Sequence, residues 1–304
     1  MSLLSTPTGR PERVFSLVSL VRVLGGRVAS GDAKEWMAPQ FRAGGGGTPM
    51  EGDGSGKPGD RVREVFRVAR DLGLLDAERD EWVGTCELPA TRREFARRVH
   101  AHLCGLPAEH PDSVLFRAYA WCAVCIEKHG IAQLVQMSSG DLASEIAAGL
   151  GRRSEDNDEK SFNTTKLSAW KDWMAYLGLG WNDLPKVSAF LPDPSRRMEE
   201  ELSKFLPEDS LVDGQSFLAA VAKNFPYLDG GSFFQEACER GRARPPAGQL
   251  SRILSQTVRS LEDSGVLGFQ MEGDSKTGIQ LFPDPLSSMN VFSHARRLKG
   301  DLHV

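Results

Sequence analysis

The clearest pattern of apolar and polar positions lies near the C-terminus, between residues 250 and 282. Apolar residues recur there at helical spacing and predict an amphipathic helix, with Arg252, Thr257 and Arg259 away from its apolar face. Gly265 follows as a helix stop, because glycine adopts the left-handed C-cap conformation without steric cost. The apolar positions are Ile253, Leu254, Val258 and Leu261.

Two short extended runs follow this helix, Val266–Met271 and Thr277–Phe282, with turn-forming residues 272–275 between them. The two runs predict a β-hairpin. Helix, glycine stop and hairpin in this order are what a winged-helix unit needs for its third helix and its wing. The stretch therefore predicts the second half of such a unit.

Two earlier stretches repeat the signature. The predicted helices Arg61–Leu72 and Phe162–Leu177 each carry an apolar helical stripe, and Gly73 and Gly178 follow them as stops. The predicted fold class is mainly α with small β-hairpins (α+β), organised as three tandem winged-helix-like units. Their predicted ranges are 1–104, with a Gly-rich insertion at 43–60; 113–192, a central helical unit; and 196–304.

Further helices follow from the same periodicity and from polar capping residues. The Gly-rich insertion predicts a flexible loop, because it has few apolar residues to bury. The predicted helices are Glu12–Leu24, Ser30–Phe41, Thr91–Leu103, Ser113–His129, Ser138–Leu150, Met198–Phe205, Gln215–Asn224 and Ser232–Arg240.

The overall composition is that of a globular protein. The chain has 304 residues, of which 40% are hydrophobic and 26% charged, with a formal net charge of −4. It contains neither an apolar run long enough to span a membrane nor a signal-peptide pattern, and its five cysteines fit a reducing compartment. We therefore expect a cytoplasmic protein, in which any DNA contact depends on local basic faces.

One cluster has the residue types of a metal site. Cys122, Cys125 and His129 share one helical face, and His100, His102 and Cys104 precede them. Structural zinc needs four such ligands, and its cysteines normally lie in turns. Because Cys122 and Cys125 fall inside an apolar helix, we favour buried thiols over metal and expect no cofactor.

Motifs for catalysis are missing from the sequence. It has no Gly-x-Ser-x-Gly elbow, no His-Glu-x-x-His and no paired-carboxylate nuclease cluster. The Gly-rich run ending at Gly56 and Lys57 is not a phosphate loop, because Glu51 stands where its first glycine is needed and Pro58 follows the lysine. The expectation is a non-enzymatic protein.

Basic residues on the three key helices and the last hairpin are the candidate functional positions. In a helix-turn-helix protein the recognition helix enters the major groove and its polar face meets phosphates and base edges. The alternative is a set of solvated faces balanced by nearby acidic residues such as Glu64, Asp172 and Glu262. The candidates are Arg61, Arg63, Arg67 and Arg70; Lys166 and Lys171; and Arg252, Arg259 and Lys276.

Both ends of the chain carry a family resemblance. Met-Ser-Leu-Leu at residues 1–4, Thr-Pro-x-x-x-Pro-Glu-Arg-Val at 6–14, Leu-Glu-Asp-Ser-Gly-Val-Leu at 261–267 and His-Ala-Arg-Arg-Leu at 294–298 resemble the DpdG family. These proteins accompany bacterial systems that place 7-deazaguanine derivatives in DNA and restrict DNA lacking them. The resemblance implies a role in DNA modification, restriction or phage defence within a complex.

The combined prediction is a non-enzymatic DNA-binding or scaffolding subunit of such a bacterial complex. Its expected partners are double-stranded DNA and the other subunits, with no membrane. One alternative is a protein-interaction subunit similar to the tandem winged-helix partners of chromosome-organising ATPases. Another is a transcription regulator, for which a homodimer and sequence-selective binding are expected.

Overall fold

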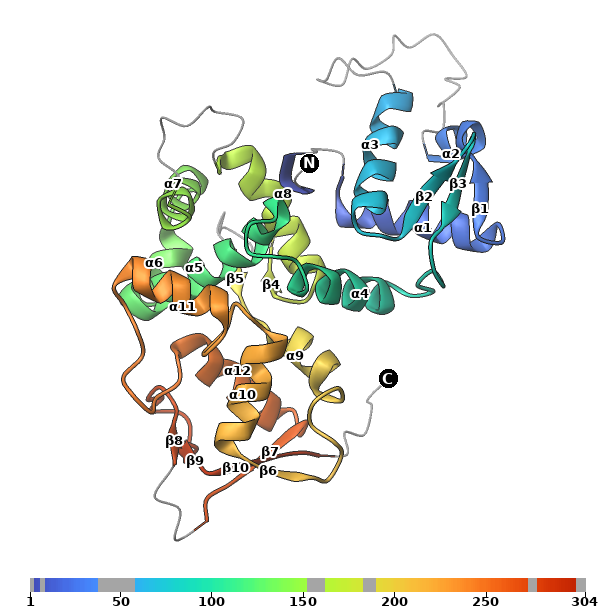
Figure 1. Ribbon diagram of the computed structural model, residues 1–304. Coiled ribbons are helices and arrows are strands. Elements are labelled where there is room, and N and C mark those ends of the chain that lie inside the picture. Colours follow the sequence, from blue (N-terminus) through green and yellow to red (C-terminus); the bar gives the residue numbers. More distant parts are fainter. Residues whose placement is uncertain are drawn as a thin grey trace, which may run out of the picture. The chain divides into compact units, whose positions relative to one another are not determined.

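The computed structural model describes residues 3–5, 9–37, 58–151, 162–182, 190–272 and 278–298. Within these ranges the chain is mainly helical, with twelve α-helices and small antiparallel sheets (Figure 1). The chain divides into two compact units, Met1–His102 and Leu103–Val304. No described helix combines the length and the hydropathy that crossing a lipid bilayer requires.

The first unit joins helices to a three-stranded sheet. The sheet has the order β1-β3-β2, and β1 and β2 both run antiparallel to β3. Its elements are η1 (Leu3–Ser5), α1 (Pro11–Val23), β1 (Arg27–Ala29), α2 (Ser30–Met37), α3 (Pro58–Asp71), β2 (Leu75–Glu78), β3 (Glu81–Gly84) and α4 (Arg92–Cys104), whose last residues belong to the second unit.

The core of this unit lies between α1, α3 and the sheet. The apolar stripe predicted for α3 is buried, and Phe66 stacks on Trp82 of β3 with ring centroids 4.4 Å apart. The predicted second helix is described over Ser30–Met37, and the rest of its predicted range lies outside the described residues, as does most of the Gly-rich insertion. The buried stripe is Val62, Val65, Phe66, Ala69 and Leu72.

The second unit is built around α5, which is buried on nearly every side, as its uniformly apolar sequence predicts. Arg117 of α5 pairs with Glu236 of α11 at 2.7 Å, and Trp170 of α8 donates to the Leu115 carbonyl at 2.9 Å. The helical elements are η2 (Pro111–Ser113), α5 (Val114–His129), α6 (Ile131–Gln136), α7 (Ser139–Gly149), α8 (Thr164–Tyr176), α9 (Ser195–Leu202), α10 (Gly214–Asn224), α11 (Ser232–Gly241) and α12 (Arg252–Asp263).

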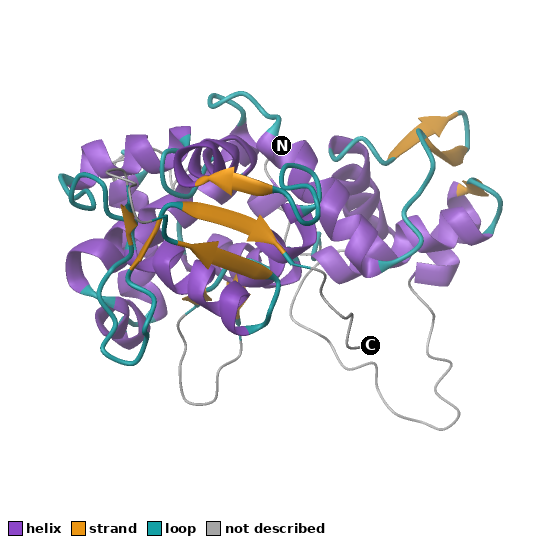
Figure 2. Cartoon of the chain, turned by 90° about the horizontal axis from the view of Figure 1, so that it is seen from below, coloured by secondary structure: helices purple, strands orange, loops and turns teal. Residues whose placement is uncertain are grey.

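Seven short strands complete this unit in three sheets. The largest has the order β6-β10-β7, and Figure 2 shows its three strands side by side. Two antiparallel pairs, β4 with β5 and β8 with β9, accompany it. The strands are β4 (Gly180–Trp181), β5 (Leu191–Pro192), β6 (Leu211–Asp213), β7 (Leu267–Gln270), β8 (Ile279–Gln280), β9 (Val291–Phe292) and β10 (His294–Arg297).

The hairpin predicted after α12 is wrong. The strand β7 pairs with β10, and the second run of the predicted hairpin, as β8, pairs with β9 instead. Ile279 turns toward the start of α10, where a Cβ at Gly214 would lie 2.5 Å from the Ile279 Cδ1. The partner of β7 therefore comes from the tail, with Ala295 fully buried at its centre.

All three predicted glycine stops are confirmed. Gly73, Gly178 and Gly265 have φ angles of +68°, +75° and +70°. At each, the N–H of the next residue reaches the carbonyl five positions back, and the glycine N–H reaches the carbonyl three positions back. This paired pattern is a Schellman cap, which satisfies carbonyls left without partners at the helix end.

Candidate nucleic-acid interface

The polar side of α3 carries the most basic surface among the predicted sites. Arg61, Arg63 and Arg70 are exposed and Arg67 is partly buried, while the apolar side of the helix faces the core. Arg70 lies 3.9 Å from the adjacent Asp71. The hydrophobic period of α3 thus directs all four arginines away from the core.

The β2–β3 hairpin that follows α3 has the opposite charge. Asp76, Glu78 and Asp80 are exposed on it, and Glu81 pairs with Arg27 of β1 at 3.2 Å. Arg79 lies in the turn with φ of +55°. An acidic hairpin repels phosphate, so α3 is the better candidate for a DNA contact in this unit.

The lysines of α8 are only partly exposed. Lys166 lies in the first turn, where the Asn163 side chain caps the helix by accepting from the Lys166 N–H at 3.0 Å. Lys171 lies one and a half turns further along, beside Asp172. Their role as DNA contacts stays a prediction.

The prediction that α12 presents Thr257 and Arg259 on an exposed outer face is wrong. Thr257 and Arg259 are buried, with Arg259 5% exposed and its Nη2 donating to the Met289 carbonyl at 3.1 Å. The segment between β8 and β9 lies against this side of the helix, where Phe282 to Pro285 line a cavity with Arg259 and the Met289 carbonyl accepts from it. Lys276 lies outside the described residues.

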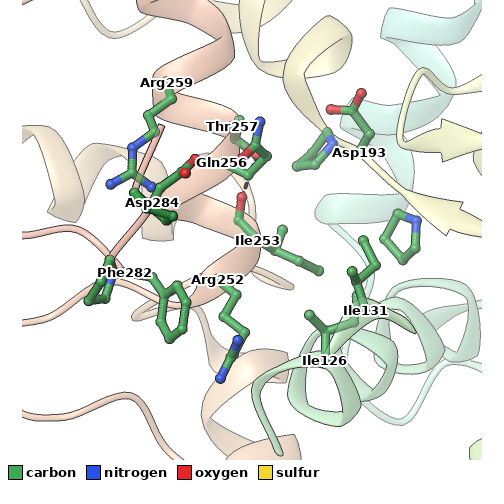
Figure 3. A pocket seen from close by; sticks show the side chains of 14 residues that line it. Ile126, Ile131, Asp193, Arg252, Ile253, Gln256, Thr257, Arg259, Phe282 and Asp284 are labelled. Carbon is green, nitrogen blue, oxygen red and sulfur yellow. Dashed lines mark hydrogen bonds between the residues drawn. The ribbon is translucent and has the colours of Figure 1, made fainter. Parts of the chain in front are cut away.

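Arg252 and Arg259 line a cavity rather than an open helix face. Figure 3 shows Arg259, Asp284 and Phe282 on one side of α12, and Ile126, Ile131 and Asp193 on the other. The guanidinium carbon of Arg252 lies 3.8 Å from the centre of the Phe282 ring. The sequence pattern could not predict this cavity, because its walls come from four separate segments of the chain.

The cysteines of α5 are buried in the helix, as the apolar pattern predicts. Burial raises the pKa of Cys125 to about 12, and its thiol donates to Glu145 Oε1 at 3.6 Å. Cys122 is buried beside it, and its pKa is also raised by burial. Among the described residues, no group of three or more His, Cys, Asp or Glu side chains is arranged to hold a metal ion.

A buried ionic cluster on α9 was missed at the sequence level. Arg197 is 1% exposed, donates from Nε to the Leu177 carbonyl at 2.6 Å, and lies 3.3 Å from Glu201 Oε1. The spacing of Arg197 to Glu200 and Glu201 was a visible signal, but such spacing is also common on exposed helices. The cluster joins α9 to the end of α8.

A family model described as DpdG-like matches residues 1–275 of the chain. The chain belongs to the DpdG-like family. Members of this family are components of 7-deazaguanine DNA modification systems. This is the setting that the resemblance at the two ends of the sequence predicted. No curated protein and no solved structure matched the chain.

Proposed function

We propose that this chain is a non-enzymatic, DNA-contacting subunit of a 7-deazaguanine DNA modification system, and that α3 makes the contact. The observation that carries the proposal is the exposed arginine face of α3, described above. Guanidinium groups bind phosphate oxygens and guanine edges through paired hydrogen bonds. A helix of 14 residues is about 21 Å long, enough to lie across a major groove.

The arrangement around α3 supports a winged-helix reading of the first unit. The elements α1, β1, α2, α3, β2 and β3 follow in that order. The strand β1 pairs with β3, on the edge of β3 opposite to β2. In this reading α3 is the recognition helix and the hairpin is the wing. Because that hairpin is acidic, the proposal assigns it no phosphate contact.

The second unit supports a similar reading with a different use. The elements α9, β6, α10, α12, β7 and β10 repeat the order, with α11 inserted before α12 and with β8 and β9 inserted between β7 and β10. In the second unit the helix that corresponds to α3 is α12, whose polar side is covered and whose Arg259 is buried. The proposal therefore gives DNA contact to the first unit and leaves the second unit for other interactions.

The second candidate function is that of an interaction or scaffolding subunit without direct DNA contact. The observation that favours it is a set of large apolar side chains at the surface, among them Trp36 and Trp181, together with the net charge of −4. Copurification of partner subunits with a chain that binds no duplex would support this candidate.

Duplex binding by the full chain, measured across a salt series, tests the proposal. Binding that weakens steeply with salt and depends on α3 is the expected result. The non-enzymatic part is tested by incubating the chain alone with modified and unmodified duplexes and Mg²⁺. Cleavage or base exchange by the purified chain would contradict it.

A further inference from the structure

The cavity over α12 has the size of a small-molecule site. Its volume is about 350 Å³, within the range of roughly 300–1,000 Å³ that is usual for ligand pockets. Ile253, Gln256 and Thr257 of α12 lie between its two sides (Figure 3). Every residue that lines it belongs to the second unit.

The walls of the cavity are mostly apolar. Isoleucines from three helices, one aromatic ring and several prolines supply this surface, which favours a ligand with an apolar body. These apolar lining residues are Ile126, Ile131, Pro192, Pro194, Ile253, Phe282, Pro283 and Pro285.

The arginines bring hydrogen-bond donors that are not used. The Nε of Arg259 and the Nε of Arg252 are both buried and find no acceptor among the described residues. Arg259 is 5% exposed, so bulk water does not replace a missing partner there. A buried donor without an acceptor is unfavourable, and a bound acceptor would remove this cost.

The carboxylates of the cavity already accept hydrogen bonds from the chain itself. Asp193 accepts from the Ser195 N–H at 3.1 Å, from the Ser195 hydroxyl at 2.6 Å and from the Trp181 indole at 3.1 Å. Asp284 accepts from the Leu286 N–H at 2.9 Å. Both carboxylates are thus held by the chain through at least one oxygen, whereas the Nε atoms of the two arginines have no acceptor among the described residues.

The N-terminus of α12 does not provide the site. Its first N–H groups are already used: Ser251 donates to Asp229, Arg252 donates to Glu127 at 2.9 Å, and Leu254 donates to the Ser251 hydroxyl. Among the lining residues, the buried side-chain donors without an acceptor are those of Arg252 and Arg259.

We propose that this cavity binds a small organic anion, with its apolar body against the isoleucines and prolines and its carboxylate or phosphate on Arg259 and Arg252. Charge-assisted hydrogen bonds to guanidinium are among the strongest available, which selects an anion over a neutral acceptor. Stacking on Phe282 holds the Arg252 guanidinium in place for this contact.

Three probes with the same ring test the proposal by isothermal titration of the full chain. They are 2-naphthoate, 2-naphthyl phosphate and the neutral 2-naphthamide. The expected result is that at least one anion binds ten-fold or more tightly than the amide. Comparison of the two anions distinguishes a carboxylate site from a phosphate site.

Two variants locate the binding. Arg259→Gln and Arg252→Gln are each expected to weaken the anion at least ten-fold and to leave the amide unchanged. Arg244→Gln is the matched control, since this exposed arginine in the same unit pairs with Glu239 and lies outside the cavity. Circular dichroism of each variant checks that it is folded, and Arg252→Gln carries the test if Arg259→Gln is not.

Three results would overturn the proposal. They are equal affinity for anion and amide, anion binding unchanged in a folded arginine variant, and no heat of binding for either anion at millimolar concentration.

Discussion

Asp229 holds Ser251 by two hydrogen bonds to one carboxylate, from the Ser251 N–H at 2.7 Å and from its hydroxyl at 2.5 Å. Ser251 is the N-cap of α12, and its Oγ in turn accepts from the Leu254 N–H at 3.2 Å. Burial raises the pKa of Asp229 from its usual 3.8 to about 6, and the charge of Glu127 adds to this, against the lowering effect of the two hydrogen bonds.

This raised pKa predicts a pH dependence of stability. Between pH 4 and pH 6 the folded chain retains a proton on Asp229 that the unfolded chain has lost, so the free energy of unfolding falls as pH rises. The free energy of unfolding should fall by about 3 kcal/mol for a pKa difference of two units, and it should fall no further above pH 6. Asp229→Asn should lack it.

Urea unfolding of the wild type and Asp229→Asn at several pH values measures this effect. The difference between the two curves should shift in favour of the variant as pH rises from 4 to 7. A difference independent of pH would mean that the pKa of Asp229 in the folded chain is ordinary.

Arg197 predicts a large loss of stability on truncation. Arg197→Ala leaves Glu201 Oε1 and the Leu177 carbonyl buried without the Arg197 donor, while Lys204 still pairs with Glu201 Oε2, and this should cost about 3–5 kcal/mol. Its neighbour Arg196 is 69% exposed in its side chain and pairs with Glu200 at 3.5 Å, so Arg196→Ala should cost at most about 1 kcal/mol. Denaturant titration of the two variants checks the contrast, and equal losses would contradict it.

Gly73 should resist substitution because of its backbone alone. A Cβ at Gly73 would meet nothing within 4 Å, yet its φ of +68° costs an L-residue about 1–2 kcal/mol. Gly73→Ala should therefore destabilise the first unit by that amount. Gly31, in α2 of the same unit, also has open space but no positive φ, so Gly31→Ala should be neutral or stabilising. Thermal melts compare the two, and a neutral Gly73→Ala would contradict the cap.

The thiols should differ strongly in reactivity. Cys86 is exposed, whereas burial raises the pKa of Cys104 and Cys125 to about 12 and that of Cys238 to about 11. Only the thiolate reacts, so iodoacetamide at pH 8 should modify Cys86 at least about 100-fold faster than these three. Peptide mass spectrometry of native and urea-treated protein measures the rates. Rapid modification of Cys125 in the native chain would contradict its burial.

The helices could be predicted from the sequence because their signals are local. The stripe of α3 and the stops at Gly73, Gly178 and Gly265 depend only on residues a few positions apart. The buried α5 was equally clear, since its apolar residues cover all sides. The resemblance at the two ends of the chain led to the correct family.

The strand pairing and the cavity could not be predicted because they depend on distant segments. The strand β7 pairs with His294–Arg297 rather than with Ile279–Gln280, and Ile279 packs against Gly214 instead. The segment between β8 and β9 lies against α12, where the Met289 carbonyl accepts from the buried Arg259. Helical periodicity cannot reveal such a cover, because it reports one face of one helix at a time.

The most direct test of the central claim is fluorescence anisotropy with a short duplex and the full chain across a salt series. DNA contact through α3 predicts that the logarithm of the association constant falls linearly with the logarithm of the salt concentration. The slope should be reduced by about 0.9 for each phosphate contact removed in Arg63→Ala and Arg67→Ala. Arg244→Ala, with the same change in net charge, should bind as the wild type does. Absence of binding at low salt, or an unchanged slope in the α3 variants, would contradict DNA contact through α3.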